Sequence, residues 1–137
     1  MKKLLLMAMA TIALLLSSCS KDDASAKKIM NIWQLEFATT DNDAILTNAC
    51  GAKMVFVFGV DEVVMYISYE DKATGTCKYK RLTAIYKIKG DIIGIGGSSY
   101  KFNVGDDTLV LIGKVDGEET LLKFRKISQA QLNALLQ

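Results

Sequence analysis

The chain has 137 residues and half of them are hydrophobic, so it can bury one domain core and is not globally disordered. Two of its 17 basic side chains are Lys2 and Lys3, and the other 15 balance all 15 acidic side chains, which removes the positive excess that nucleic-acid binding needs. The chain contains no histidine, which excludes histidine-based catalytic triads and nearly all catalytic zinc sites.

Residues 1–18 have the pattern of a secretory signal peptide. Lys2 and Lys3 form a basic start, and residues 4–16 are apolar apart from Thr11. A helix that spans a bilayer needs about 20 apolar residues, so this run is too short for a stable transmembrane anchor. The segment is therefore expected to direct export and then to be removed.

The residues that follow the apolar run resemble the lipobox of bacterial lipoproteins. Leu16, Ser17 and Ser18 precede Cys19. In that family the cysteine thiol receives diacylglycerol, the leader is cut just before it, and the acyl chains hold the protein on a membrane. Because residue 20 is Ser rather than Asp, the resemblance implies a Gram-negative outer membrane, on its periplasmic face or at the cell surface. An ordinary signal peptide with a free Cys19 thiol is the alternative.

Residues 19–28 are polar after the lipidation site and are expected to form a tether, with one domain over residues 29–137. Residues 24–30 allow one or two helical turns. After them, hydrophobic and polar residues alternate with the period of a half-buried strand, as at Trp33, Leu35 and Phe37. Strands are predicted at residues 32–37, 53–58, 63–69, 77–89 (one bent strand or two), 92–95, 100–104, 108–112 and 120–127.

Turns and loops separate these strands. Residues 39–48 are rich in Asp, Asn and Thr and predict a loop, and residues 97–99 and 116–117 predict turns. Ser128 and Gln131 have the spacing of a capping box, which predicts a short amphipathic helix at the end of the chain.

Eight or nine short strands at spacings near ten residues predict an antiparallel meander. A sheet of that length closes or splits into two layers, because open edges invite aggregation. The expected fold is all-β, a small antiparallel up-and-down barrel with short helices at both ends. An eight-stranded barrel has an interior filled by side chains or holding one small ligand.

The segment Ile32–Leu35, with the helical turn before it, resembles the opening of lipocalin-like domains, in which a tryptophan on the first strand closes one end of the barrel. Residues 86–91, 107–111 and 122–127 are similar to segments of small bacterial lipocalin-like lipoproteins. The resemblance covers residues 29–129. It implies either binding of a small apolar molecule or a sheet scaffold without a known ligand.

Aromatic side chains on the predicted strands are expected to point into the barrel. They either pack as a core or line a ligand pocket in which tyrosine hydroxyls are polar anchors. Phe37 belongs to this inward set, and the candidate pocket residues are Trp33, Phe56, Phe58, Tyr86, Tyr100, Phe102 and Phe124.

Cys50 and Cys77 remain when Cys19 is lipidated, and an even pair in an oxidising compartment predicts a disulfide. Two free buried thiols are the alternative. Both cysteines fall at one end of the meander, but the strands that carry them are ~10 Å apart, whereas a bridge needs Cα atoms within ~7 Å. The loop over residues 39–51 must therefore fold over the end of the third strand.

Several cations fall close together in the chain, and they are expected on outward strand faces or on a docking face for anionic polymers or lipid head groups. They are Lys78, Lys80, Arg81, Lys87 and Lys89, with Lys123, Arg125 and Lys126 as candidate neighbours.

The sequence leaves two functional hypotheses, both non-enzymatic, because no nucleophile–base pair and no metal ligand set is visible. The first is a lipid-anchored envelope protein that binds a small apolar or amphipathic ligand in its barrel. The second is a solid-core barrel that docks on a secreted or envelope protein, with inhibition of that protein as one version. Neither hypothesis requires a cofactor or nucleic acid.

Overall fold

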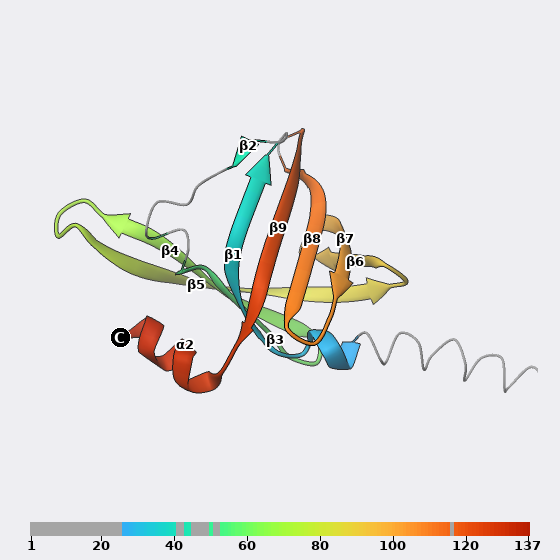
Figure 1. The fold of residues 1–137 in the computed structure, drawn as a ribbon, viewed down its shortest axis with the longest axis horizontal. Coiled ribbons are helices and arrows are strands. Elements are labelled where there is room, and N and C mark those ends of the chain that lie inside the picture. Colours follow the sequence, from blue (N-terminus) through green and yellow to red (C-terminus); the bar gives the residue numbers. More distant parts are fainter. Residues whose placement is uncertain (1–25, 41–42, 45–49, 51–52, 116) are drawn as a thin grey trace, which may run out of the picture.

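The computed structural model of the protein describes residues 26–40, 43–44, 50, 53–115 and 117–137 (Figure 1). Residues 26–29 are helical, and they lead into strands and a C-terminal helix. These elements are β1 (Ile32–Thr40), β2 (Asp43–Ala44), β3 (Val55–Phe58), β4 (Glu62–Asp71), β5 (Thr76–Lys89), β6 (Ile92–Ile95), β7 (Ser98–Val104), β8 (Thr108–Val115), β9 (Glu118–Ile127) and α2 (Gln129–Leu136).

The strands form one antiparallel sheet that closes on itself. From β3 to β9 each strand pairs with the next one along the chain, while β1 pairs with β3 on one side and with β9 on the other. This last pairing closes eight strands into a barrel, and β2 extends the sheet beside the end of β1. The predicted all-β up-and-down barrel is confirmed.

Alternate side chains of the strands fill the barrel with one hydrophobic core. At the end where β1 begins, the helical turn closes the barrel, because the Trp33 indole Nε1 donates a hydrogen bond of 2.9 Å to the carbonyl of Ile29. Both residues are fully buried. The largest other fully buried side chains are Phe124, Ile93, Leu109, Leu111, Val55 and Val63.

A β-bulge in β1 overturns the prediction that Phe37 points inward. The register of β1 against β9 shifts between Leu35 and Phe37, so one extra residue interrupts the alternation. Ala38 then faces the core with 6% of its surface exposed, while Phe37 is 43% exposed on the outside. A strict period of two in the sequence cannot reveal such an insertion.

Two predicted boundaries are also corrected. The expected loop over residues 39–48 begins too early, because β1 continues to Thr40 and pairs with Asp43 and Ala44 of β2. The expected turn over residues 97–99 is shorter, because β7 begins at Ser98. Residues 77–89 belong to one long strand, β5.

The helix α2 covers part of the outer wall of the barrel. The predicted capping box is confirmed, since the Ser128 hydroxyl accepts from the Gln131 amide and the Gln131 side chain accepts from the Ser128 amide. Leu132 of α2 packs against Val55 and Ile127, which point out of the barrel. The same outer cluster includes Ile32, Val57, Tyr66, Leu135 and Leu136.

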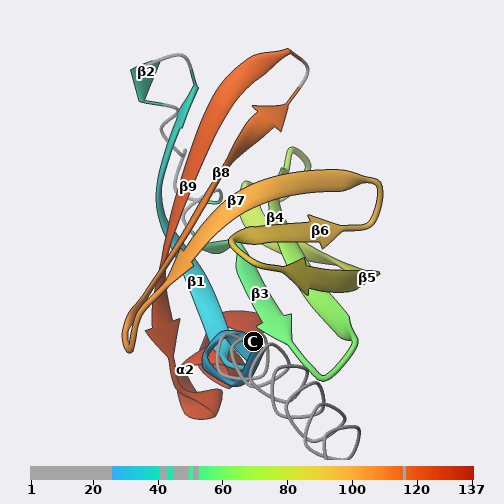
Figure 2. The same cartoon turned by 90° about the vertical axis from the view of Figure 1, so that its right-hand side faces the viewer.

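The β4–β5 hairpin extends beyond the barrel wall (Figures 1 and 2). Its strands pair over ten residues each, from Glu62–Ile85 to Asp71–Thr76. However, β3 pairs only with Val63–Tyr66, and β6 pairs only with Tyr86–Lys89. The half of the hairpin nearest its turn therefore projects as a two-stranded arm.

Candidate functional site

The seven predicted pocket residues all lie in the barrel core, where six are buried and Tyr100 is half-buried. Their rings contact one another: the centroids of Phe56 and Phe124 are 5.0 Å apart, and those of Phe58 and Tyr86 are 5.1 Å apart with perpendicular planes. Such offset and edge-on contacts are typical of a packed aromatic core. Binding of a ligand by these side chains remains a prediction.

The polar group of Tyr86 is also satisfied within the protein. Its hydroxyl donates a hydrogen bond of 2.5 Å to the carbonyl of Gly59. Burial, and secondarily the negative charge of Asp61, raise the pKa of Tyr86 above its usual value. The hydroxyl thus remains protonated and anchors β5 to the turn between β3 and β4.

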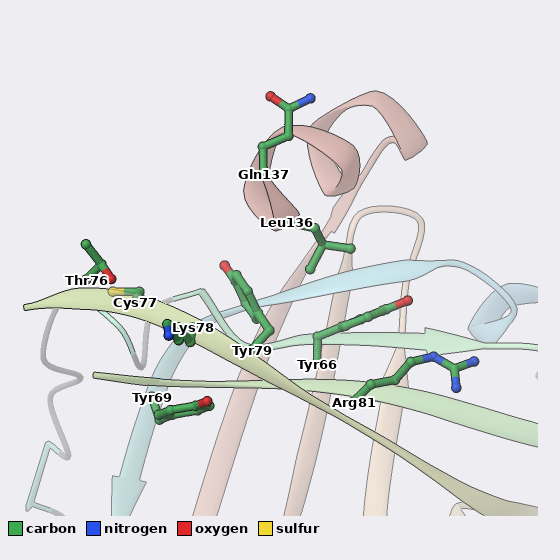
Figure 3. A pocket seen from close by; sticks show the side chains of 9 residues that line it. All are labelled: Tyr66, Tyr69, Thr76, Cys77, Lys78, Tyr79, Arg81, Leu136 and Gln137. Carbon is green, nitrogen blue, oxygen red and sulfur yellow. The ribbon is translucent and has the colours of Figure 1, made fainter. Parts of the chain in front are cut away.

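The main candidate site is a hollow of about 650 Å³ on the outside of the barrel (Figure 3). It lies between the projecting arm and the C-terminal end of α2. Its lining combines aromatic, cationic and small polar side chains: Tyr66, Tyr69, Thr76, Cys77, Lys78, Tyr79, Arg81, Leu136 and Gln137.

The strand register brings the floor of this hollow together. Tyr66 is directly opposite Arg81, and Ser68 is directly opposite Tyr79, so these four side chains share one face of the hairpin. The same face contacts α2, because Tyr66 and Leu136 belong to one outer hydrophobic cluster. The end of the helix therefore forms one wall of the hollow.

Tyr79 contributes an unusual polar group. Its hydroxyl is buried and has no hydrogen-bond partner among the residues that the structure describes. Burial raises the pKa of Tyr79, so the group is a neutral donor and acceptor at physiological pH. A buried hydroxyl without a hydrogen-bond partner costs free energy.

A disulfide and a side-chain hydrogen bond hold Cys50 against the arm. Cys50 is bonded to Cys77 with their Cα atoms 5.4 Å apart, and the hydroxyl of Ser68 in β4 donates to the carbonyl of Cys50. This geometry confirms the predicted pairing, and it places Cys50 beside Ser68 of β4; most of the predicted loop lies outside the described residues. It also fixes the start of β5, which lines the hollow.

Interactions between neighbouring residues stabilise the turn at the end of the arm. Gly75 adopts a φ of 69°, a left-handed conformation that glycine reaches without strain. Asp71 accepts from the Ala73 amide at 2.9 Å and forms an ion pair of 2.7 Å with Lys78. The Lys78 ammonium, followed by the Ala73 amide, holds the pKa of Asp71 below its usual value.

The predicted basic stretch does not form one face. Alternation along β5 places Lys78 and Lys80 on one side of the sheet and Arg81, Lys87 and Lys89 on the other. The second basic group, on β9, is not adjacent, because β6, β7 and β8 lie between the two strands on one side and β4, β3 and β1 on the other. The expected proximity of Lys123, Arg125 and Lys126 to β5 is therefore wrong.

A second hollow of about 480 Å³ lies over the outward face of β5 and β6, where Gly94 and Gly96 leave space beside Ile85 and Lys87. Its lining is dominated by one aliphatic side chain and backbone. It therefore offers fewer directed interactions than the hollow beside α2.

Among the described residues, no three His, Cys, Asp or Glu side chains group as metal ligands, and no helix is long and apolar enough to cross a membrane. The leader and Cys19 lie outside the described residues.

Comparison with known proteins does not assign the chain to a family. No protein-family model matches the chain, and no curated protein matches it significantly in sequence.

Sequence reasoning missed the hollow beside α2. Tyr66, Tyr69 and Tyr79 lie on predicted strands, but only the register of the hairpin and the docking of α2 bring them together with Arg81. The turn at Asp71–Gly75 could have revealed this pairing. Counting the same number of residues away from the turn along both strands places Tyr66 opposite Arg81.

Proposed function

We propose that this protein is a lipid-anchored cell-envelope protein whose barrel is a solid scaffold and whose outer surface docks on a secreted or envelope protein. The packed aromatic core is the observation that carries the proposal. Binding, rather than catalysis, is the activity assigned to it.

The core favours surface binding over an internal ligand. Phe56 contacts both Phe58 and Phe124, and Phe58 contacts Tyr86, so a molecule between these rings would have to separate them. Burial of one such side chain stabilises the fold by about 1.5–3 kcal/mol. An internal ligand would have to offset several of these contacts at once.

The leader and lipobox support the anchor. Acyl chains on Cys19 would place the chain at the outer membrane, and residues 20–28 would connect them to the barrel. A fully extended tether of this length spans at most about 30 Å. The barrel would therefore act close to the membrane surface, on partners of the same envelope.

The hollow beside α2 supports recognition. Its lining contains three tyrosines and the two cations Lys78 and Arg81, and no Asp or Glu. Aromatic faces with nearby cations are enriched where proteins recognise partners. The projecting arm presents this lining away from the barrel wall.

Cross-linking in intact cells tests the proposal. A photoreactive amino acid at Thr74, in the turn of the arm, should give one discrete cross-linked product in native cells, and the same group at Lys123 on β9 should not. A Cys19→Ser variant should lose radioactive palmitate and leave the membrane fraction. Absence of any cross-link at Thr74, or membrane retention of the unacylated variant, would contradict the proposal.

The first of the two sequence hypotheses, a small apolar ligand in the barrel mouth, would give a different result. The purified protein would then carry a small molecule whose removal lowers its thermal stability, with no cross-link at the arm.

A further inference from the structure

The strand β5 has an edge that is only partly paired. One side of Thr76–Ile85 pairs with β4 along its whole length. On the other side β6 begins to pair at Tyr86, and the Ile85 carbonyl accepts from the Gly96 amide at 3.0 Å. Among the described residues, no strand pairs with this side of Thr76–Ala84, so its backbone groups form a template for a further strand.

The hollow beside α2 follows this edge. It touches the successive residues Thr76, Cys77, Lys78 and Tyr79. Successive residues of a strand point to opposite faces of the sheet. The hollow therefore contacts both faces of β5. Because β4 covers one edge of β5, the hollow must pass around the other edge, which is unpaired. Figure 3 shows Tyr79 and Tyr69 on opposite sides of the hairpin, with Tyr79 directed toward the end of α2.

We infer that an extended acidic segment of the partner protein adds to the Thr76–Ala84 edge of β5 as a further strand. This inference rests on the proposed function and names the chemistry of its partner. Backbone hydrogen bonds to the edge fix the register of the added strand on β5. The side chains of the hollow determine which sequences bind.

Charge decides which segment fits. From Cys77 to Lys89 the strand carries five cations and no acidic side chain. Lys78 is already paired with Asp71, but Lys80 and Arg81 are exposed and form no ion pair with another described residue. They lie on opposite faces of β5, so they can contact acidic side chains on either face of an added strand.

The same charges argue against a second copy of this chain on the edge. Two β5 strands side by side would bring Lys78, Lys80 and Arg81 close to their own counterparts, and like charges on adjacent strands destabilise pairing.

The experiment is a titration of the full chain followed by NMR spectroscopy of its backbone amides. The ligand is a soluble peptide of about ten residues that alternates glutamate with threonine, a composition that is acidic and favours extended strands. We expect saturable shifts confined to the amides of Thr76–Ala84 and the end of α2. A peptide with methylated backbone nitrogens keeps the charge, cannot pair, and should not produce these shifts.

Charge-reversal variants give matched controls. Lys80→Glu with Arg81→Glu should weaken the affinity about tenfold. Lys87→Glu with Lys89→Glu makes the same charge change in the part of β5 that β6 already pairs, and should change the affinity less than about twofold. Circular dichroism checks that both variants fold, and a lysine–threonine peptide should recover binding to the first variant only.

Equal weakening by both variants, or undiminished binding of the methylated peptide, would overturn strand addition in favour of unspecific attraction. If millimolar peptide produces no amide shifts, the inference that an acidic segment adds to β5 is overturned. The proposed function would then still be tested by the cross-link at Thr74. If the peptide shifts the edge but Thr74 gives no cross-link in cells, the edge binds acidic strands and the proposed envelope partner fails.

Discussion

At the scale of single residues, Tyr79 and Tyr86 lie on the same strand but differ in how their hydroxyl groups are satisfied. The Tyr86 hydroxyl donates to the Gly59 carbonyl, whereas the buried Tyr79 hydroxyl has no partner among the described residues. The first hydroxyl therefore stabilises the barrel, whereas the second is a buried polar group whose burial is not offset by a hydrogen bond to a described residue.

Substitution of these tyrosines by phenylalanine should separate the two roles. Tyr86→Phe should lower the free energy of unfolding by about 1 kcal/mol, because it removes a buried hydrogen bond. Tyr79→Phe should leave the free energy unchanged or raise it, because the lost group has no partner. Urea unfolding of both variants measures the difference, and a larger loss for Tyr79→Phe than for Tyr86→Phe would be inconsistent with these assignments.

The pKa values of these tyrosines predict how stability changes at alkaline pH. Burial is the main cause that raises both pKa values above 10.0, the ordinary value of a tyrosine, so the unfolded chain loses its tyrosine protons at lower pH than the folded one. Their contribution is therefore fully present below pH 10 and is lost as the pH rises through the raised values.

The double variant Tyr79→Phe/Tyr86→Phe should consequently lose less stability than the native protein between pH values of about 9 and 11. Urea midpoints across this range measure the effect, and the remaining tyrosines and lysines are common to both proteins. Parallel curves for the two proteins would show that the tyrosines do not titrate differently on folding.

Gly113 is a position where an added Cβ atom should destabilise the fold. A Cβ there would lie 2.6 Å from Cδ1 of Tyr100 and 3.1 Å from the backbone oxygen of Ser99. Gly113→Ala should lower the free energy of unfolding by about 1–3 kcal/mol, the usual range for overpacking. Gly94→Ala is the matched control in a strand, because its Cβ would meet nothing closer than 3.9 Å. Equal effects of the two substitutions on urea midpoints would argue against the close approach of Tyr100.

At the scale of elements, the β4–β5 arm depends on its connections to the rest of the chain. Most of the outer half of this hairpin is paired only within itself, and an isolated two-stranded hairpin is marginally stable in water. The Cys50–Cys77 bond and the Ser68 hydrogen bond to Cys50 hold the arm in place.

Removal of the disulfide should therefore destabilise the protein and loosen the arm first. The two cysteines are 27 residues apart, and a loop of that length contributes about 3–4 kcal/mol when closed. Cys50→Ser/Cys77→Ser should lose this amount in urea unfolding, and amides of the arm should exchange faster than those of β8 and β9. A reductant should lower the free energy of unfolding of the native protein to that of the variant, and should not change that of the variant. If the reductant also destabilised the variant, the effect on the native protein would not come from the Cys50–Cys77 bond alone.

At the scale of the whole molecule, the parts that sequence reasoning predicted are those set by neighbouring residues. Alternation along the chain predicts the main strands, and the Ser128–Gln131 spacing predicts the capping box. The bulge beside Phe37 and the pairing of Thr39–Thr40 with Asp43–Ala44 were missed, because both depend on the register of β1 with its partner strands.

The candidate site was less predictable than the fold for the same reason. The pairing of Cys50 with Cys77 followed from compartment and strand order. The hollow, in contrast, requires Leu136 and Gln137 to lie beside Tyr79 and Arg81, which precede them by more than fifty residues. The bounds of β6, Ile92–Ile95, were predicted, but its pairing with only the last four residues of β5 depends on the strand register.

Mass spectrometry of the full-length protein, purified from its own envelope, tests the central claim most directly. In the denatured spectrum we expect loss of residues 1–18, the mass of acyl chains on Cys19, and two hydrogens fewer than the reduced chain for the Cys50–Cys77 bond. In the native spectrum we expect no additional small molecule, since the aromatic core is filled by its own side chains. An extra mass of a few hundred daltons that disappears on denaturation would contradict the solid barrel and establish a carried ligand, and an unmodified Cys19 would contradict the lipid anchor.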